Sequence, residues 1–262
     1  MTEIHPHAIV SPRARIGPGV RIGAYAVVGD EVELGEGCVV HPHVVVRGPS
    51  RFGRGNIFHP FSSVGGDPQD LKFHGERTEL VAGNENVFRE NVTVSRGTAG
   101  GGAVTTIGSG SLFMAYSHVA HDCHIGDQTI FANGATLAGH VTVEDFATIG
   151  AFSPVHQFCR IGRYAYIGAS TVITQDVPPF SRVVTERNTA CYGINAIGLE
   201  RRGFTPERLR PIEQAFRLLL RSKLNTAQAL EQMRATLSGS PDVEELIRFL
   251  EFVHRSGRGL TK

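Results

Sequence analysis

The sequence predicts a mainly β protein: a parallel β-helix built from six-residue repeats, followed by a C-terminal α-helical domain. Across residues 107–178 an apolar residue opens every block of six: Ile107, Phe113, Val119, Ile125, Phe131, Leu137, Val143, Ile149, Val155, Ile161, Ile167 and Ile173. A period of six fits neither the 3.6-residue turn of an α-helix nor the two-residue alternation of a half-buried strand. It is typical of a β-helix, in which each block is a short strand plus a bend and successive coils stack.

Two other positions of the block are also selective. The fifth position holds a small or β-branched residue, so we expect the first and fifth residues to point inward and fill a narrow prism. The second position is often glycine, as at Gly108, Gly126 and Gly150, which we expect to ease the backbone dihedral angles at the corners. Cys38 and Cys123 fall in the inward fifth position, so core packing explains them better than a disulfide.

The same period begins at Ile4, and two excursions interrupt it at about residues 65–81 and 95–106. Glycines mark both as departures from the coil, and the first also contains a proline. Long loops on a rigid scaffold often carry function. The first loop is rich in closely spaced polar residues and is expected to be functional, whereas the second is Gly-rich and is either functional or a disordered insertion.

We assign residues 1–187 to the β-helix and residues 188–262 to the helical domain. The six-residue period stops before this boundary, and helical patterning takes over. Thr205, followed by proline, predicts the start of one helix. Asn225 predicts a second helix with a capping box, and Ser240, again followed by proline, predicts a third.

Charge is distributed unevenly along the chain, although the net charge is only +1. Residues 1–200 carry 14 Lys and Arg against 18 Asp and Glu, whereas residues 201–262 carry 12 against 7. The basic C-terminal part suggests an acidic partner. We find no signal peptide before the first repeat and no apolar run long enough to cross a bilayer. We therefore expect a cytoplasmic protein with no membrane span and no nucleic-acid partner.

Hexapeptide repeats of this kind resemble those of the left-handed β-helix acyltransferase superfamily. The resemblance implies a left-handed coil with three blocks, or eighteen residues, per triangular turn. Residues eighteen apart should then stack at about 4.8 Å. This register puts His121, Gly139 and Gln157 in one column, stacks Asp122 on His140, and places all five on one flat outer face. None of them occupies a core position, so we expect the chemistry there.

The resemblance becomes specific when several motifs are combined: Gln69-Asp70-Leu71-Lys72, residues 118–123, 137–140, 155–158 and 198–204. Together they resemble the acyl-ACP–UDP-N-acetylglucosamine O-acyltransferase family over the whole chain. The resemblance implies an enzyme that moves an (R)-3-hydroxyacyl chain from acyl carrier protein to the 3-hydroxyl of UDP-N-acetylglucosamine, the first step of lipid A biosynthesis. It implies no cofactor and a homotrimer whose active sites lie in the grooves between neighbouring prisms.

The resemblance also assigns roles. His121 is the general base, Asp122 orients it, and the backbone N–H of Gly139 stabilises the thioester oxyanion, without a metal. Tyr166 and Ala169 fall where the family measures acyl length, and alanine there suggests a medium chain. Ten residues match substrate-binding positions: Gln69, Asp70, Lys72, His118, His140, His156, Gln157, Asn195, Arg201 and Arg202.

One departure and two rival functions stay open at this stage. Ile197 stands where the family often has an acidic residue, so an acceptor with a 3-amino group, which would give an amide, remains an alternative. A γ-type carbonic anhydrase would use the same fold and hold zinc across a subunit boundary with three histidines, for which the candidates are His118, His121, His140 and His156. A non-enzymatic trimeric docking platform is the third possibility, but it leaves the His121–Asp122–Gly139 arrangement without a role.

Overall fold

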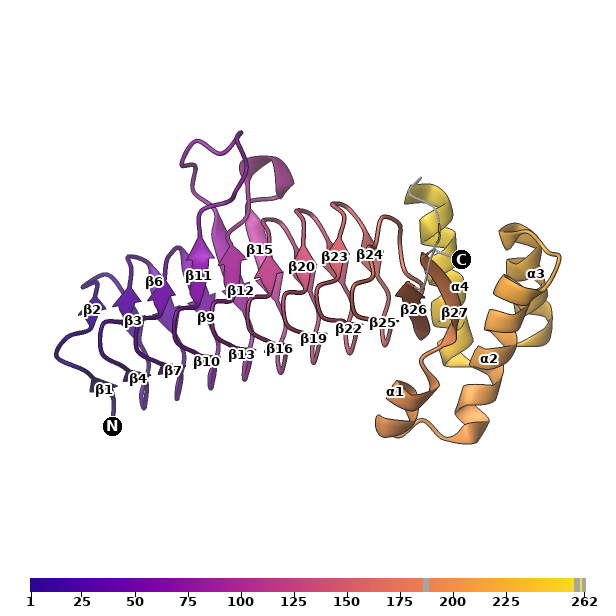
Figure 1. The fold of residues 1–262 in the computed structure, drawn as a ribbon, viewed down its shortest axis with the longest axis horizontal. Coiled ribbons are helices and arrows are strands. Elements are labelled where there is room, and N and C mark those ends of the chain that lie inside the picture. Colours follow the sequence, from indigo (N-terminus) through magenta and orange to yellow (C-terminus); the bar gives the residue numbers. More distant parts are fainter. Residues whose placement is uncertain (186–188, 257–259, 261–262) are drawn as a thin grey trace.

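The computed structural model describes residues 1–185, 189–256 and 260, and shows a long rod of stacked coils that ends in a group of helices (Figure 1). The rod has three sheets. The first is eleven-stranded, with β1 (Glu3–Ile4), β4 (Arg21–Ile22), β7 (Val39–Val40), β10 (Ile57–Phe58), β13 (Val87–Phe88), β16 (Leu112–Phe113), β19 (Ile130–Phe131), β22 (Thr148–Ile149), β25 (Tyr166–Ile167), β26 (Ser181–Thr185) and β27 (Thr189–Ile194).

The other two sheets have eight strands each. The second sheet contains β2 (Ile9–Val10), β5 (Val27–Val28), β8 (Val45–Val46), β11 (Ser63–Gly66), β14 (Thr93–Ser95), β17 (His118–Val119), β20 (Thr136–Leu137) and β23 (Pro154–Val155). The third sheet contains β3 (Arg15–Ile16), β6 (Val32–Leu34), β9 (Ser50–Phe52), β12 (Glu79–Ala82), β15 (Val104–Ile107), β18 (His124–Ile125), β21 (Thr142–Val143) and β24 (Arg160–Ile161).

Successive coils pair in parallel, with residues eighteen apart side by side in the regular part of the rod. His118 pairs with Thr136, and Thr136 with Pro154. Only β26 and β27, among the described strands, pair antiparallel. The predicted left-handed parallel β-helix with C-terminal helices is confirmed.

The core is built as the six-residue period predicts. From residue 107 onward the first and fifth residues of the blocks are buried, including Phe113, Val119 and Cys123. Aromatic rings continue the stack between coils: the centroids of Phe88 and Phe113 lie 5.1 Å apart, and those of Phe113 and Phe131 lie 4.8 Å apart. A continuous apolar column therefore fills the prism, as one-residue-per-coil stacking requires.

The glycines in the second position of the block have a different role from the one expected. None of Gly108, Gly126 or Gly150 has a positive φ. Instead, a Cβ on Gly108 would lie 2.7 Å from the carbonyl carbon of Gly126 in the next coil, and one on Gly150 would lie 2.5 Å from backbone atoms. These glycines are needed because neighbouring coils approach closely, not because the chain turns there.

The turns themselves define three corners of the prism. The first corner joins the first sheet to the second, the second corner joins the second sheet to the third, and the third corner leads back to the first sheet. The residues at positive φ include Tyr116 at the first corner, Asp122 at the second and Phe146 at the third. These corners, not the flat sheets, carry most of the large exposed side chains of the rod.

Both excursions leave the rod at the second corner. Residues 67–78 connect β11 to β12, and residues 96–103, which include the short 3-10 helix η1 (Ala99–Gly101), connect β14 to β15. They project from the same side of the rod (Figure 1).

The C-terminal part contains α1 (Ala196–Arg201), α2 (Pro206–Arg221), α3 (Thr226–Thr236) and α4 (Pro241–Ser256). The expected helix starts are confirmed for α2, where the Thr205 side chain accepts a hydrogen bond from the Arg208 N–H, and for α3, where Asn225 forms a capping box. α4 begins directly after Ser240. The predicted boundary between residues 187 and 188 lies outside the described residues. No helix in the described part of the chain combines the length and apolar character needed to cross a membrane.

Candidate active site

The second corner gathers the residues expected to perform catalysis. His121 and Asp122 lie in the turn between β17 and β18, and Gly139 and His140 lie one coil further on, between β20 and β21. The expectation of a flat outer face is wrong, because each strand is only two residues long and the remaining residues of the block turn the corner. Asp122 and His140 both adopt positive φ, at 58° and 62°, as other residues do at the corners of the prism.

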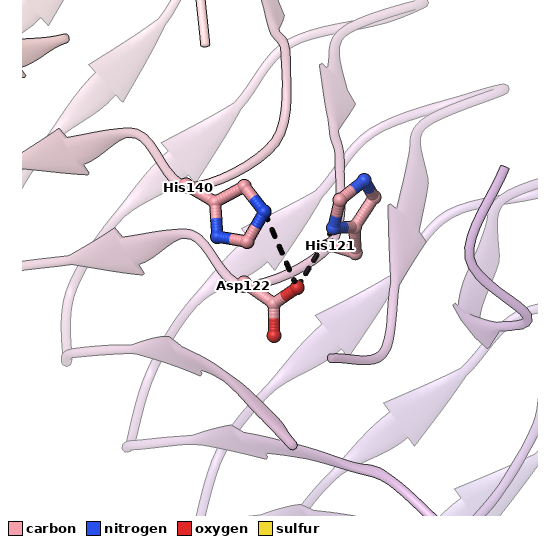
Figure 2. A group of neighbouring side chains, drawn as sticks. All are labelled: His121, Asp122 and His140. Carbon is pink, nitrogen blue, oxygen red and sulfur yellow. Dashed lines mark hydrogen bonds and ion pairs between the residues drawn. The ribbon is translucent and has the colours of Figure 1, made fainter. Parts of the chain in front are cut away.

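His121 and Asp122 form a hydrogen-bonded dyad. The Nδ1 atom of His121 lies 2.7 Å from Oδ2 of Asp122, and the imidazole of His140 approaches the same oxygen to 3.9 Å. Figure 2 shows both rings turned toward the carboxylate. Pairing with a carboxylate puts the hydrogen of neutral His121 on Nδ1 and leaves the Nε2 lone pair able to accept a proton.

The Asp122 carboxylate is buried but well supplied with hydrogen-bond donors. Its side chain accepts a hydrogen bond from the Thr98 N–H at 2.8 Å and another from the Thr98 hydroxyl at 2.6 Å. Burial raises the pKa of the Asp122 carboxyl, but the hydrogen bonds from Thr98 and His121 outweigh it, so the net pKa is lowered. The buried group therefore stays ionised at neutral pH and can orient the imidazole.

Gly139 packs directly against the ring of His121. A Cβ at position 139 would lie 2.6 Å from Cε1 of His121 and 2.8 Å from Nε2. The predicted column of His121 above Gly139 is therefore present. Within the described residues the Gly139 N–H donates no hydrogen bond inside the chain, so this donor is available to a ligand.

A groove of about 440 Å³ runs along the second sheet beside the dyad. Five predicted site residues line it: Gln69, His118, His121, Gly139 and His156. The rest of its wall is mostly apolar, with Leu137, Val155 and Ile173 among the lining residues. An apolar groove with a few convergent polar groups suits a ligand that has both an apolar chain and polar groups.

His118 and His140 flank the dyad in different ways. The Nδ1 atom of His118 lies 2.7 Å from the Thr93 hydroxyl, and burial followed by the nearby His121 lowers the pKa of His118. His140 stacks on Phe158 with ring centroids 4.5 Å apart. Burial lowers the pKa of His140, although the charge of Asp122 opposes this. Both rings are therefore expected to be neutral at pH 7 and to act through hydrogen bonds, not through charge.

The first excursion carries its predicted residues to the same corner. The Lys72 N–H donates to the Asp70 carboxylate at 3.0 Å, which folds the loop tip into a tight turn. Asp70 is close enough to His140 for its negative charge to oppose, in part, the lowering of the pKa of that ring by burial. Leu71 is fully exposed at this tip.

His156 and Gln157 lie one coil beyond Gly139, in the turn between β23 and β24. The Nδ1 atom of His156 lies 3.0 Å from the Gln157 carbonyl oxygen, and His156 lines the groove. Gln157 is exposed and does not line it.

The three residues predicted to bind the nucleotide stand elsewhere in the chain. The guanidinium of Arg202 lies over the ring of Phe146 at 4.7 Å and donates to the Gln128 carbonyl at 3.4 Å, both at the third corner. Asn195 donates to the Tyr164 carbonyl at 3.2 Å, at that same corner. Arg201 ends α1 and is exposed, and Ile197 on the same helix is 66% exposed.

The residues predicted to set acyl length lie apart from both sets. Tyr166 is in β25 of the first sheet, and Ala169 follows it at the first corner. Both are exposed, and neither lines the groove beside His121. One chain therefore does not bring the catalytic, nucleotide and acyl-length residues together. They lie at the second corner, at or near the third corner, and from the first sheet to the first corner, respectively.

Among the described residues, one group of His, Cys, Asp and Glu has the spacing of metal ligands: His121, Asp122 and His140, whose donor atoms lie within 4.8 Å of one another. Its hydrogen bonds do not favour a metal. Both oxygens of Asp122 already accept hydrogen bonds from Thr98, and the Nδ1 of His121 faces the carboxylate.

The residues around Asp122 were not found by sequence reasoning. Thr98 and Gly101 come from the Gly-rich second excursion, and Thr105 accepts a hydrogen bond from the Asp122 N–H at 2.9 Å. A Cβ on Gly101 would lie 2.1 Å from the Asp122 carboxyl carbon. The only signal available was a threonine within a glycine-rich run, which does not reveal a partner 24 residues away.

A larger cavity, of about 780 Å³, lies between the third sheet and α4. Its charged groups are largely paired with one another: Arg160 with Glu144, and Arg163 with Asp145 and Glu245. Burial raises the pKa of Glu245. Its described lining residues do not include a histidine hydrogen-bonded to a carboxylate like His121, or Gly139 with its available N–H. The second corner therefore remains the candidate active site.

Known proteins resemble this chain over its full length. The family described as "Udp N-acetylglucosamine O-acyltransferase; Domain 2" matches residues 176–261, and bacterial transferase hexapeptide repeats match residues 13–48 and 105–139. The chain is 49% identical to an acyl-[acyl-carrier-protein]–UDP-N-acetylglucosamine O-acyltransferase of Xylella fastidiosa, covering 96% of each protein. It is 52% identical to the enzyme of that name from Anaeromyxobacter dehalogenans, covering 99% of each. The structure of LpxA from Acinetobacter baumannii superposes with a TM-score of 0.93 at 39% identity, covering 99% of both chains.

Proposed function

The chain belongs to the acyl-[acyl-carrier-protein]–UDP-N-acetylglucosamine O-acyltransferase family, and we propose that it transfers a 3-hydroxyacyl chain from acyl carrier protein to the 3-hydroxyl of UDP-N-acetylglucosamine, the first step of lipid A biosynthesis. The observation that carries this proposal is the His121–Asp122 dyad beside an apolar groove. We propose that the protein acts in the cytoplasm.

The dyad supplies general base catalysis. A sugar hydroxyl is a poor nucleophile until a base removes its proton as it attacks the thioester carbonyl. The Nε2 atom of His121 takes that proton while Asp122 stabilises the imidazolium that forms. A C–O bond forms, the C–S bond breaks, and the proton on His121 then passes to the leaving thiolate of the carrier protein.

Gly139 provides the electrostatic part of the reaction. Gly139 packs against the His121 ring, and its N–H donates no hydrogen bond within the described chain, so this donor is available to the oxyanion of the tetrahedral intermediate. Gln69, Asp70, Lys72, His118, His140, His156 and Gln157 are proposed to position the sugar and phosphates. Arg201 and Arg202, with Asn195, are proposed to hold the diphosphate, because guanidinium groups match phosphate oxygens.

The distribution of these residues supports a homotrimer with shared active sites. If the first sheet of one copy faces the second sheet of the next, the third corner of one chain meets the second corner of its neighbour. That contact joins Arg202 of one copy to His121 of another, and it places Ala169 along the same groove. It is a heterologous contact, which closes into a ring when repeated around an axis.

The exposed first corner supports the same assembly. Tyr25, Phe61, Tyr116 and Phe152 all stand at this corner, and each is more than half exposed in the single chain. Exposed aromatic residues in one row are typical of a surface that another chain covers. The packing of the first sheet against the second turns this corner toward the axis, where three copies would bury the row.

Product analysis tests the reaction. The purified protein is incubated with UDP-N-acetylglucosamine and a mixture of 3-hydroxyacyl carrier proteins, and the product is identified by mass spectrometry. We expect a single acyl ester, without added zinc. A product formed only from a 3-amino sugar nucleotide would establish the amide alternative. Catalysis that depends on zinc would favour the metal alternative.

Complementation tests the shared site. His121→Ala and Arg202→Ala should each reduce activity strongly when alone. If the two residues act in one groove from different copies, trimers that contain both variants carry one intact groove and regain activity. No recovery in co-expressed variants, or a fully active monomer by light scattering, would contradict the shared-groove proposal.

A further inference from the structure

The second excursion connects the first excursion to the His121–Asp122 dyad. Arg96, at its start, is buried and donates to the carbonyls of Gly48 at 2.9 Å and Gly65 at 2.8 Å. Its guanidinium also pairs with Asp67 at 2.5 Å, at the base of the first excursion. The two loops are therefore fastened to each other and to the rod, so residues 96–103 have a fixed position.

Thr98 stands at the point where this loop meets the dyad. It is buried, and its carbonyl accepts hydrogen bonds from the N–H groups of Gly101 at 3.0 Å and Ala103 at 2.8 Å. Its own N–H donates to one oxygen of Asp122, and its hydroxyl donates to the other. Two donors from one residue fix both the position and the plane of the carboxylate.

We propose that Thr98 is a positioning residue for the acyl transfer: its hydroxyl and N–H hold Asp122 in the orientation in which it pairs with Nδ1 of His121. This inference rests on the proposed function of His121 as the general base. It adds a third member, drawn from the other loop, to the dyad.

The consequence for catalysis follows from the hydrogen bonds. Oδ2 of Asp122 accepts from the Thr98 hydroxyl at 2.6 Å and from His121 at 2.7 Å, with the His140 ring 3.9 Å away. Without the hydroxyl, the carboxylate has one fewer donor and can rotate. His121 then loses a fixed partner, and its Nε2 is no longer held toward the groove. Hydrogen bonds to the ionised form also keep the carboxylate weakly basic.

Gly101 completes the arrangement from the other side. Since a Cβ there would lie 2.1 Å from the carboxyl carbon, the side chain of Asp122 is confined between Gly101 and its donors. A Cβ on the neighbouring Gly100 would meet nothing within 4 Å, and the φ of Gly100 is not positive. These two glycines therefore offer a matched pair for the effect of pressing on the carboxylate.

The test compares two substitutions of the same residue. Thr98→Val keeps the shape and removes the hydroxyl, whereas Thr98→Ser keeps the hydroxyl and removes the methyl. We expect Thr98→Val to lower kcat by about 10- to 100-fold with little change in KM, and Thr98→Ser to stay within about threefold of the wild type. The control is Thr78→Val, at a buried threonine whose hydroxyl has no hydrogen-bond partner among the described residues, which should leave kcat unchanged.

A pH profile separates positioning from packing. Loss of the hydroxyl makes the carboxylate a better proton acceptor, so the acid limb of kcat/KM should move to higher pH in Thr98→Val and stay in place in Thr98→Ser. A packing defect would lower activity at every pH without moving the limb. Gly101→Ala should lower kcat, and Gly100→Ala should not.

A measurement without substrate makes the inference independent of the reaction. The proton on Nδ1 of His121 should give a downfield ¹H NMR signal in the wild type and in Thr98→Ser. It should be lost in Thr98→Val. Retention of this signal together with wild-type kcat in Thr98→Val would overturn the proposal. If the wild type has no acyltransferase activity but Thr98→Val still loses the signal, the result would support the positioning role of Thr98 and count against the proposed reaction alone.

Discussion

Replacement of Gly139 by alanine gives the most direct test of the site geometry. The added Cβ would lie 2.6 Å from Cε1 of His121, whereas ordinary contacts of this kind are 3.4–4 Å. The ring must therefore move by about 0.8 Å, or the turn that carries residue 139 must shift by that amount. The ring is held by its 2.7 Å hydrogen bond to Asp122, so a movement of this size strains or breaks the dyad.

The expected loss follows from this displacement. A shift of about 1 Å in a catalytic group costs on the order of 10²-fold in rate. We expect Gly139→Ala to lower kcat by about that factor, with a small change in KM for the sugar nucleotide. The substitution keeps the backbone N–H, and residue 139 has no positive φ, so the loss would come from the ring and not from an absent oxyanion donor.

The assay is steady-state acyl transfer with the carrier-protein donor, supported by a double-mutant cycle. In a His121→Ala background the ring is absent, so adding Gly139→Ala should lower kcat by less than about threefold further. The control is Gly66→Ala, where a Cβ meets nothing within 4 Å and φ is not positive. A Gly139→Ala enzyme with wild-type kcat, or a full additional loss in the His121→Ala background, would refute the argument.

Three further outcomes are expected. His121→Ala should lower kcat by about 10²–10⁴-fold and leave KM for the sugar nucleotide nearly unchanged; near-wild-type turnover with the natural donor would contradict its role as base. Ala169→Gly should shift acyl-chain preference toward longer chains by about 10–200-fold, as measured with mixed donors, and an unchanged profile would place the end of the acyl site elsewhere. The pKa of Asp122 is lowered from its ordinary value of 3.8, so the ionised carboxylate stabilises the fold at pH values above 3.8. This stabilisation is lost as the pH falls below 3.8 toward the lowered pKa. Calorimetry should therefore show a smaller loss of Tm between about pH 5 and pH 3 in Asp122→Asn than in the wild type, and equal losses would mean that the carboxylate is not the responsible group.

Stacking was predictable because each contact repeats at a constant sequence separation. The apolar first and small fifth positions needed only the six-residue period, and the structure buries Val119 and Cys123 as expected. The column of His121 on Gly139 follows from the same register. Helix caps such as Thr205 were predictable because a cap involves residues only three apart.

The role assigned to the second-position glycines was wrong for a related reason. The period places Gly126 at the second position of its block, but it does not say whether the chain turns there or meets a neighbouring coil. In the structure a Cβ on Gly126 would lie 2.7 Å from the backbone N of Asp145 in the next coil. The contact between coils, not the local dihedral angle, requires glycine.

The sequence by itself determined the stacked coil, because this depends on a periodic pattern. The eighteen-residue register and the roles of His121 and Asp122 came from the resemblance of the sequence to the acyltransferase family. Only the tertiary structure decided what supports the dyad and how the site is distributed. The bond from Thr98 to Asp122 joins a loop without any period to a turn 24 residues away. The separation of His121 and Arg202 onto different corners depends on where each two-residue strand ends and the chain bends. Neither the path of a loop nor the place of a bend is written in the six-residue period, because both are set by hydrogen bonds and packing between segments distant in sequence.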